Sequence, residues 1–173
     1  MDLFKKYLKL TKSVPILKRA ITCKSYRNVY YFENGVILKD EEINHELATF
    51  GDAVLKFVLC EKFLDKKDKL SKYIQKYLTD KNLIEIIGKH YQIIDYLYFD
   101  YFDISVPRDY VFDRQDRHKY IATSVEAMLG AIYLYKKNLN DVRKIIDEFI
   151  KLIDSRVFNW KKLTFYKKSR KKW

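Results

Sequence analysis

Two acidic residues lie among apolar neighbours, and each has a glycine close by in the sequence. Asp52 directly follows Gly51, and Glu126 precedes Gly130 by four residues. Carboxylates rarely occur in apolar surroundings unless they are paired, hydrogen-bonded or bound to a metal ion. If the two segments pack side by side, both carboxylates could bind one Mg²⁺, which keeps several waters and needs few protein ligands. The alternative is that both acids lie on solvent-facing helix surfaces.

A Mg²⁺ ion held by such a pair would suit phosphodiester hydrolysis. A bound metal lowers the pKa of its water and neutralises charge on a phosphate that is being cut. The glycines bear on this because a glycine inside a helix costs about 1 kcal/mol relative to alanine and needs a compensating gain. Close packing against another backbone is the simplest compensation, so we expect it at Gly51 and Gly130.

The segments that carry the two acids show apolar residues at helical spacing. The pattern predicts a helix from Asp40, whose side chain can cap a first turn, through Leu59. It also predicts two final helices over residues 119–135 and 140–153, and Glu126 lies in the first of them. Further helices are expected over residues 2–20, as one or two short helices broken near Pro15, and over residues 69–78 and 82–88, with Thr79 and Asp80 between them.

Two stretches interrupt this helical pattern. Residues 29–38 are predicted to be extended or looped, with a turn at Gly35, and residues 91–117 to run from a helix into a long loop around Pro107. The chain has only 4 Gly and 2 Pro in 173 residues, which favours helices over a turn-rich β fold. We therefore predict an all-α fold, with a single helical domain over residues 1–155 and a basic, aromatic tail over residues 156–173.

Composition limits the classes of protein to which the chain can belong. The 48% hydrophobic and 16% aromatic residues allow a substantial core and exclude a disordered or collagen-like chain. No stretch approaches 18 consecutive apolar residues, and the first residues alternate Lys with Leu, so we expect a soluble, cytoplasmic protein with no membrane segment. Cys23 and Cys60 lack metal-ligand spacing and are expected to be free thiols.

Positive charge is concentrated at the end of the sequence. Eight of the net +12 charges lie in residues 156–173, which contain no acid, so residues 1–155 carry +4. Cations interleaved with aromatic rings can pair with phosphates and stack on bases. A solubilising, disordered tail is the alternative. The candidate RNA-binding residues in this tail are Lys161, Lys162, Lys167, Lys168 and Arg170.

Four segments in the same order resemble the catalytic domain of ribonuclease III. Residues 44–55 read NHELATFGDAVL, which is similar to the family signature NERLEFLGDAVL. Residues 20–26, AITCKSY, resemble ALTHKSY, and residues 69–72, KLSK, resemble part of GELSKLRAALV. Residues 122–134, ATSVEAMLGAIYL, are similar to ADTVEALIGAIYL. The resemblance covers roughly residues 10–150 and predicts the family's helical endonuclease-domain fold.

The resemblance implies a Mg²⁺-dependent endoribonuclease, with Mn²⁺ as a possible substitute, that acts on double-stranded RNA as a homodimer and leaves 5′-phosphate ends. Family members use two acids from each of two helices. Asp52 and Glu126 match the two acids on which cleavage most depends, whereas Ala48 and Thr123 replace the other two. Each pair lies on one helix face, at i and i+4 or at i and i+3. Losing one acid from each pair should lower the affinity for metal, and the Thr123 hydroxyl could fill a coordination position.

One branch of the family, the mini ribonuclease III proteins, resembles the chain at both departures. Those proteins carry LAYIGDA on the first helix and STAFEALLG on the late helix, lack a separate double-stranded RNA-binding domain, and still cleave. We therefore expect an active enzyme with Asp52 and Glu126 as catalytic residues and with Thr123 joining them as metal ligands. RNA processing, such as rRNA maturation, is the expected context.

Other departures affect RNA binding and dimer formation. Thr49 replaces an aromatic residue that the family uses in its dimer contact, and His45 replaces a Glu. His45 could contact substrate, although a lone helix His is more often structural or solvent-exposed. Lys69 replaces an acid of the cleavage valley and either binds phosphate or is solvated. Cations that correspond to a basic insertion of the mini enzymes are further RNA-binding candidates, unless nearby acids pair with them: Arg108, Arg114, Arg117 and Lys119.

Two rival hypotheses remain open at this point. The chain could be a catalytically inactive, RNA-binding or ribosome-associated structural protein that has kept the fold. It could also be a dimerising partner that inhibits or positions another nuclease. The substitutions at Ala48 and Thr123 favour these rivals, whereas Asp52 and Glu126 favour the enzyme.

Overall fold

A computed structural model of the protein describes residues 2–99 and 115–169, with side chains described for residues 2–66, 69–99 and 119–155. The longer helices are α1 (Leu3–Leu10), α2 (Pro15–Ala20), α3 (Tyr26–Asn34), α4 (His45–Phe63), α5 (Leu70–Leu78), α8 (Gln115–Lys136) and α9 (Asn140–Ser169). Single turns form α6 (Asp80–Asn82) and α7 (Lys89–Tyr91). Short 3₁₀ turns cover Asp40–Glu42, Leu64–Lys69 and Ile93–Tyr96, and a π-helical segment covers Leu83–Gly88.

The predicted all-α, single-domain architecture is confirmed for the part of the chain that the structure describes. There, extended backbone pairs only at one isolated bridge, between Thr22 and Tyr98. Two hydrogen bonds form this bridge, from the Cys23 amide to the Tyr98 carbonyl at 2.8 Å and from the Tyr98 amide to the Ile21 carbonyl at 2.9 Å. The bridge holds the segment after α2 against the segment that follows Ile93–Tyr96. No helix within residues 2–99 and 115–169 combines the length and apolar character that crossing a bilayer requires.

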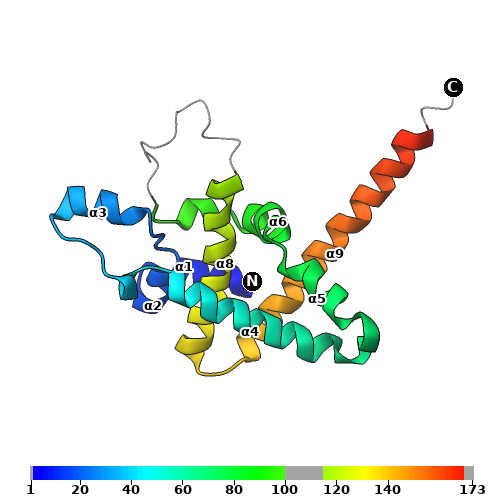
Figure 1. Cartoon of the computed structure of the whole chain (residues 1–173), viewed down its shortest axis with the longest axis horizontal. Coiled ribbons are helices and arrows are strands. Elements are labelled where there is room, and N and C mark those ends of the chain that lie inside the picture. Colours follow the sequence, from blue (N-terminus) through cyan, green and yellow to red (C-terminus); the bar gives the residue numbers. More distant parts are fainter. Residues whose placement is uncertain (1, 100–114, 170–173) are drawn as a thin grey trace.

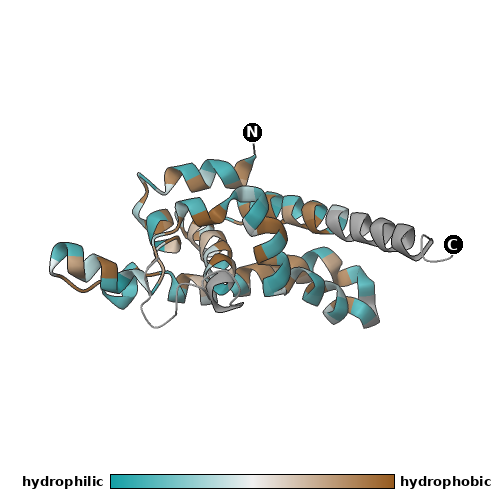
Figure 2. Cartoon of the chain, turned by 90° about the horizontal axis from the view of Figure 1, so that it is seen from above, coloured by the Kyte–Doolittle hydropathy of each residue, from teal (hydrophilic) through white to brown (hydrophobic). Residues whose placement is uncertain are grey.

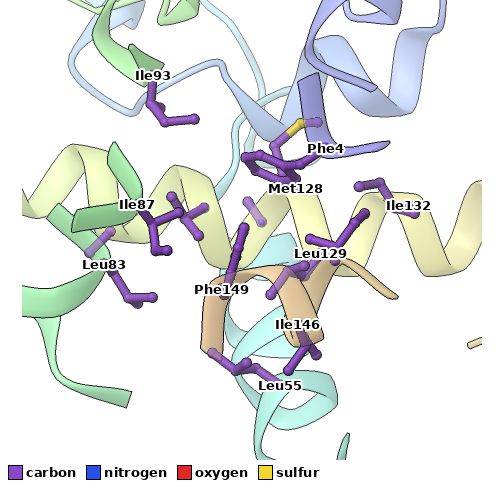
Figure 3. Packing of buried hydrophobic residues seen from close by; sticks show 14 of the residues in the cluster. Phe4, Leu55, Leu83, Ile87, Ile93, Met128, Leu129, Ile132, Ile146 and Phe149 are labelled. Atoms are coloured by element: carbon purple, nitrogen blue, oxygen red, sulfur yellow. The ribbon is translucent and has the colours of Figure 1, made fainter. Parts of the chain in front are cut away.

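The helix α8 runs through the centre of the molecule, and α4 crosses it (Figure 1). These two helices make the most extensive contact of any two elements. Residues 127–132 of α8 are buried on every side, which is typical of a central helix and explains why α8 has little amphipathic character. Side chains from α1, α4, α9 and the π-helical segment surround it in the core (Figure 3), among them Phe4, Leu55, Leu83, Ile87, Ile146 and Phe149.

A small buried polar cluster connects the start of α4 to α8. The Asn44 side-chain amide donates a hydrogen bond to the Ser124 hydroxyl at 3.1 Å, and its backbone amide donates one to the Thr22 carbonyl at 2.9 Å. Asn44 and Ser124 are both almost inaccessible to solvent. Buried polar groups with satisfied partners favour one arrangement over others. The cluster therefore sets where α4 begins relative to residues 123 and 124 of α8.

Two predictions for residues 29–45 are wrong. Residues 29–38 do not form an extended segment throughout, because α3 continues to Asn34 and Gly35, with φ 69°, caps its end. This helix has no buried residue and stands away from the rest of the chain (Figure 2). The helix predicted from Asp40 instead begins at His45, because Asp40–Glu42 forms a separate 3₁₀ turn.

The last two helices are longer than predicted. The helix expected over residues 119–135 begins earlier, at Gln115, and the helix expected over residues 140–153 continues through Ser169. No Gly or Pro occurs after Gly130, so the chain lacks the residues that most often end a helix. The predicted break between residues 78 and 82 is confirmed, because the Thr79 hydroxyl accepts a hydrogen bond from the Asn82 amide and caps α6.

Candidate active site

The two helices that carry the acids touch through their glycines. A Cβ atom on Gly51 would lie 1.8 Å from the Glu126 carbonyl oxygen, and one on Gly130 would lie 2.7 Å from the Leu47 carbonyl oxygen. Neither position has room for a side chain, which confirms the close packing expected at both glycines. Because Asp52 follows Gly51 directly, this crossing brings the first acid beside the second.

A pocket of about 450 Å³ lies where α4, α5, α6 and α8 meet. Asp52 and Glu126 both line it, so the structure brings together the two residues predicted to be catalytic. Thr123, the third predicted metal ligand, lines the same pocket. The remaining lining residues are His45, Ala48, Thr49, Lys56, Gln75, Leu78, Asp80 and Lys119.

Asp52 is partly accessible and already has a cationic partner. Its side chain is 32% exposed, and its Oδ2 atom accepts a hydrogen bond from Lys56 Nζ at 2.5 Å, one helical turn further along α4. This hydrogen bond raises the pKa of Lys56, so the lysine stays protonated across the physiological range. The carboxylate that is predicted to bind a metal is therefore paired with a lysine.

Glu126 has the most informative protonation behaviour in the pocket. Its pKa is raised to about 7, mainly by burial and then by the nearby charges of Asp52 and Asp80, against the opposing charges of Lys56 and Lys119. Among the described residues, no side chain forms a hydrogen bond or ion pair with this carboxyl group. A carboxyl group that titrates near neutral pH beside other carboxylates is typical of a functional site.

The positions of the two missing acids form part of the pocket wall. Ala48 is buried, and Thr123 is partly buried on the α8 side. An acid at either position would add a further carboxylate to the cavity that Asp52, Asp80 and Glu126 already line. The pocket therefore carries less negative charge than a four-acid site, and the Thr123 hydroxyl remains a predicted ligand.

Asp80 and Lys56 are charged pocket residues that were not predicted from the sequence, and Gln75 also lines the pocket without having been predicted. Asp80 was predicted only to separate two helices, yet the turn at Thr79 places it in the cavity and close enough to raise the pKa of Glu126. Lys56 lies four residues after Asp52, and this i, i+4 spacing was a usable signal for an ion pair. No sequence pattern indicated that Asp80 lies close to Glu126, because this proximity depends on contacts between segments that are distant in the sequence.

The structure places the predicted RNA-binding residues unevenly. Lys119 lines the pocket, whereas Lys69 is exposed at the start of α5 and does not line it. Arg117, Lys161, Lys162, Lys167 and Lys168 lie within α8 or α9, at positions whose side chains are not described. Arg108, Arg114 and Arg170 lie outside the described residues. For all of these residues, RNA binding stays a prediction.

The residues present suit Mg²⁺ better than a metal that needs an all-protein cage. Within residues 2–99 and 115–169, no group of three or more His, Cys, Asp or Glu side chains is arranged to hold a metal ion. Asp52 and Glu126 nevertheless face one cavity, and their mutual repulsion contributes to the raised pKa of Glu126. Mg²⁺ usually binds through one or two carboxylates and keeps several waters. The donor set therefore fits a Mg²⁺ ion with few protein ligands.

We expect Asp80→Asn to lower the pKa of Glu126 below about 7, because the substitution removes a negative charge that disfavours ionisation of this carboxyl group. Titration of the Glu126 carboxyl carbon by NMR in metal-free protein measures this directly. Asp147→Asn is the matched control, since Asp147 lies on α9, pairs with Lys62 and does not line the pocket. An unchanged Glu126 titration in Asp80→Asn would contradict the placement of Asp80.

Solved structures that share this fold include two of the nuclease domain of ribonuclease III from Campylobacter jejuni. The first has a TM-score of 0.59 and 20% sequence identity, over 89% of this chain and 96% of that chain. The second has a TM-score of 0.58 and 20% identity, over 90% of this chain and 95% of that chain. The fold is therefore that of a ribonuclease III nuclease domain. A comparison with curated proteins gave no match.

The Ribonuclease-III-like family matches residues 14–152, a range that includes Asp52, Glu126 and the whole pocket. The chain belongs to this family, which confirms the resemblance seen in the four sequence segments. Family membership points to an endoribonuclease that acts on structured RNA.

Proposed function

We propose that the protein is a Mg²⁺-dependent endoribonuclease that hydrolyses phosphodiester bonds in double-stranded or structured RNA and leaves 5′-phosphate ends. The observation that carries this proposal is the pocket at the α4–α8 crossing, where Asp52 and Glu126 face one cavity and Glu126 titrates near pH 7. RNA processing, including the maturation of rRNA, is the role that such an activity would serve.

The pocket residues have separate proposed roles in binding the metal and in attracting the RNA backbone. Asp52, Glu126 and the Thr123 hydroxyl would hold Mg²⁺, which supplies an activated water and positive charge for the phosphate. Without metal the Glu126 carboxyl group holds its proton up to about neutral pH, and Mg²⁺ bound to the same group would displace that proton. Lys56 and Lys119 place positive charge beside the carboxylates, where it can attract the RNA backbone.

Duplex RNA would be recognised by its A-form shape, its phosphates and its 2′-hydroxyls, so sequence selectivity should be weak. We propose that phosphate contacts of several basic residues supply affinity: Lys69, Arg108, Arg114, Arg117, Lys119, Lys161, Lys162, Lys167, Lys168 and Arg170. Such binding weakens steeply as salt is added.

A homodimer would complete the active arrangement. A two-fold axis would place two pockets across one groove of the duplex, so that both strands are cut. One of the similar Campylobacter jejuni structures is described as having structural flexibility in a region involved in dimer formation. In this chain Thr49, on α4, lines the pocket, and a dimer contact built on this small residue would differ from one built on an aromatic residue.

The second candidate function is a non-cleaving RNA-binding protein that keeps the nuclease fold. Ala48 and Thr123 favour this function, because each replaces an acid of the family's site. The ion pair between Lys56 and Asp52 favours it as well. Such a protein would bind duplex RNA and leave it intact in the presence of Mg²⁺.

Cleavage of a labelled RNA duplex of about 30 base pairs, ample for one dimer, tests the proposal. We expect wild-type protein to cut the duplex with Mg²⁺ and not with EDTA, and Asp52→Asn to lower the rate by at least about a hundredfold because one metal ligand is lost. Asp147→Asn is the matched control and should cut at the wild-type rate, since its carboxylate pairs with Lys62 away from the pocket.

Each result of this assay separates the two candidate functions. Products that require Mg²⁺ and disappear in Asp52→Asn establish the endoribonuclease. Binding of the duplex by the wild type without any cleavage, with Mg²⁺ or with Mn²⁺, would instead establish the non-cleaving RNA-binding protein.

A further inference from the structure

We propose that Lys56 is an internal counterion of the active site, which occupies the Asp52 carboxylate in the metal-free protein and is displaced from it when a divalent cation binds. This inference rests on the proposed metal-dependent function and adds a regulatory element to the same pocket. It assigns a role to a residue that does not belong to the acid set predicted from the sequence.

The contact between the two side chains has the geometry of a direct competitor for metal. Lys56 Nζ lies 2.5 Å from Asp52 Oδ2, so the ammonium group occupies one face of the carboxylate that would ligate the ion. Both residues lie on α4 at i and i+4 and line the same pocket. The ammonium group repels a divalent cation that approaches the same carboxylate, so the two cations compete for Asp52.

The lysine also compensates for the charge that the pocket has lost. Three carboxylates line the described part of the cavity, those of Asp52, Asp80 and Glu126. Lys56 and Lys119 oppose them, and both act electrostatically on Glu126. The two lysines neutralise part of the negative charge that would attract a metal ion. This lowers the affinity of the pocket for the ion and favours weak, reversible binding.

The exposure of the pair allows the exchange to occur without unfolding. The Lys56 side chain is 51% exposed, so it can swing into solvent, and an exposed ion pair of this kind is weak enough to be displaced. Lys56 keeps its charge after it leaves Asp52. It then remains at the rim of the pocket as a cation available to an RNA phosphate.

The affinity of the full-length protein for Mn²⁺, measured by isothermal titration calorimetry at pH 8 without RNA, tests this exchange. We expect Lys56→Gln to bind Mn²⁺ about threefold to tenfold more tightly than wild type, because the competing ammonium group and its repulsion of the cation are both removed. Lys56→Arg keeps the charge and should retain the wild-type affinity within about twofold. Lys62→Gln is the matched control, since Lys62 lies on the same helix and pairs with Asp147 outside the pocket.

The outcomes distinguish a failure of this inference from a failure of the proposed function. Mn²⁺ affinity in Lys56→Gln that equals or falls below that of the wild type would overturn the exchange, while Mg²⁺-dependent cleavage by wild-type protein would still establish the nuclease. Tighter binding in Lys62→Gln as well would also overturn it, because general surface charge would then explain the effect. Absence of Mn²⁺ binding in wild type and in Lys56→Gln alike would overturn both the exchange and the metal site.

Discussion

Glu126→Gln is expected to abolish RNA cleavage and, at the same time, to stabilise the folded protein above pH 7. The loss of cleavage should be about a thousandfold or more, because the substitution removes a predicted metal ligand. The gain in stability follows from the same feature. A carboxyl group with a raised pKa is one that the folded protein disfavours in its charged form.

The sign of the pH dependence follows from the pKa of Glu126 in each state. The pKa is about 7 in the folded protein and near the ordinary value of 4.5 when unfolded. The folded state therefore binds the proton more tightly, so this contribution to stability is fully present below pH 4.5 and is lost as the pH rises to 7. The full shift corresponds to about 3 kcal/mol, and partial exposure of the side chain reduces this to about 1–2 kcal/mol.

Thermal unfolding of metal-free wild type and Glu126→Gln at pH 5 and pH 8 measures the effect. At pH 8 the variant should melt about 3–6 °C above wild type, and at pH 5 this gain should largely disappear. Addition of Mg²⁺ should raise the melting temperature of wild type more than that of the variant, because binding to the folded state stabilises it. Glu61→Gln is the control, since Glu61 lies on α4 and pairs with Arg143 at the surface. An equal difference between wild type and Glu126→Gln at both pH values would contradict the raised pKa.

The helical fold was predictable because most helices bury a regular apolar face. The helices α4 and α8 were predicted from such spacing, and the family resemblance placed Asp52 and Glu126 on them. The helix α3 was missed although Tyr26, Val29 and Tyr30 recur at helical spacing, and it buries none of its residues. Its end was nevertheless marked by Gly35, whose positive φ is typical of a helix C-terminus.

The composition of the pocket was only partly predictable. The pairing of Lys56 with Asp52 follows from spacing along one helix, which a sequence displays directly. The approach of Asp80 to Glu126 depends on how the turn after α5 packs against α8, and no local pattern reports such a contact. Sequence reasoning therefore identified the acids that the family retains and missed the acid that this fold brings from another element.

Gly51→Ala is expected to destabilise the protein by about 3–5 kcal/mol, which is enough to unfold many domains. The added Cβ atom would lie 1.8 Å from the carbonyl oxygen and 2.6 Å from the carbonyl carbon of Glu126, and neither is the mobile end of a side chain. Both atoms are helix backbone, so α4 and α8 would have to separate. Such overpacking outweighs the better helix propensity of alanine, worth about 1 kcal/mol.

Urea unfolding of three glycine variants separates this contact from general effects of replacing glycine. Gly130→Ala should rank second, because its Cβ atom would lie 2.7 Å from the Leu47 carbonyl oxygen. Gly35→Ala should cost only about 1–2 kcal/mol, the strain of its positive φ, since no atom lies within 4 Å of the added Cβ. A loss in Gly51→Ala no larger than that in Gly35→Ala would contradict the contact. Any Gly51→Ala protein that still folds should lose cleavage as well, because the helix separation that admits the methyl group also moves Glu126 away from Asp52.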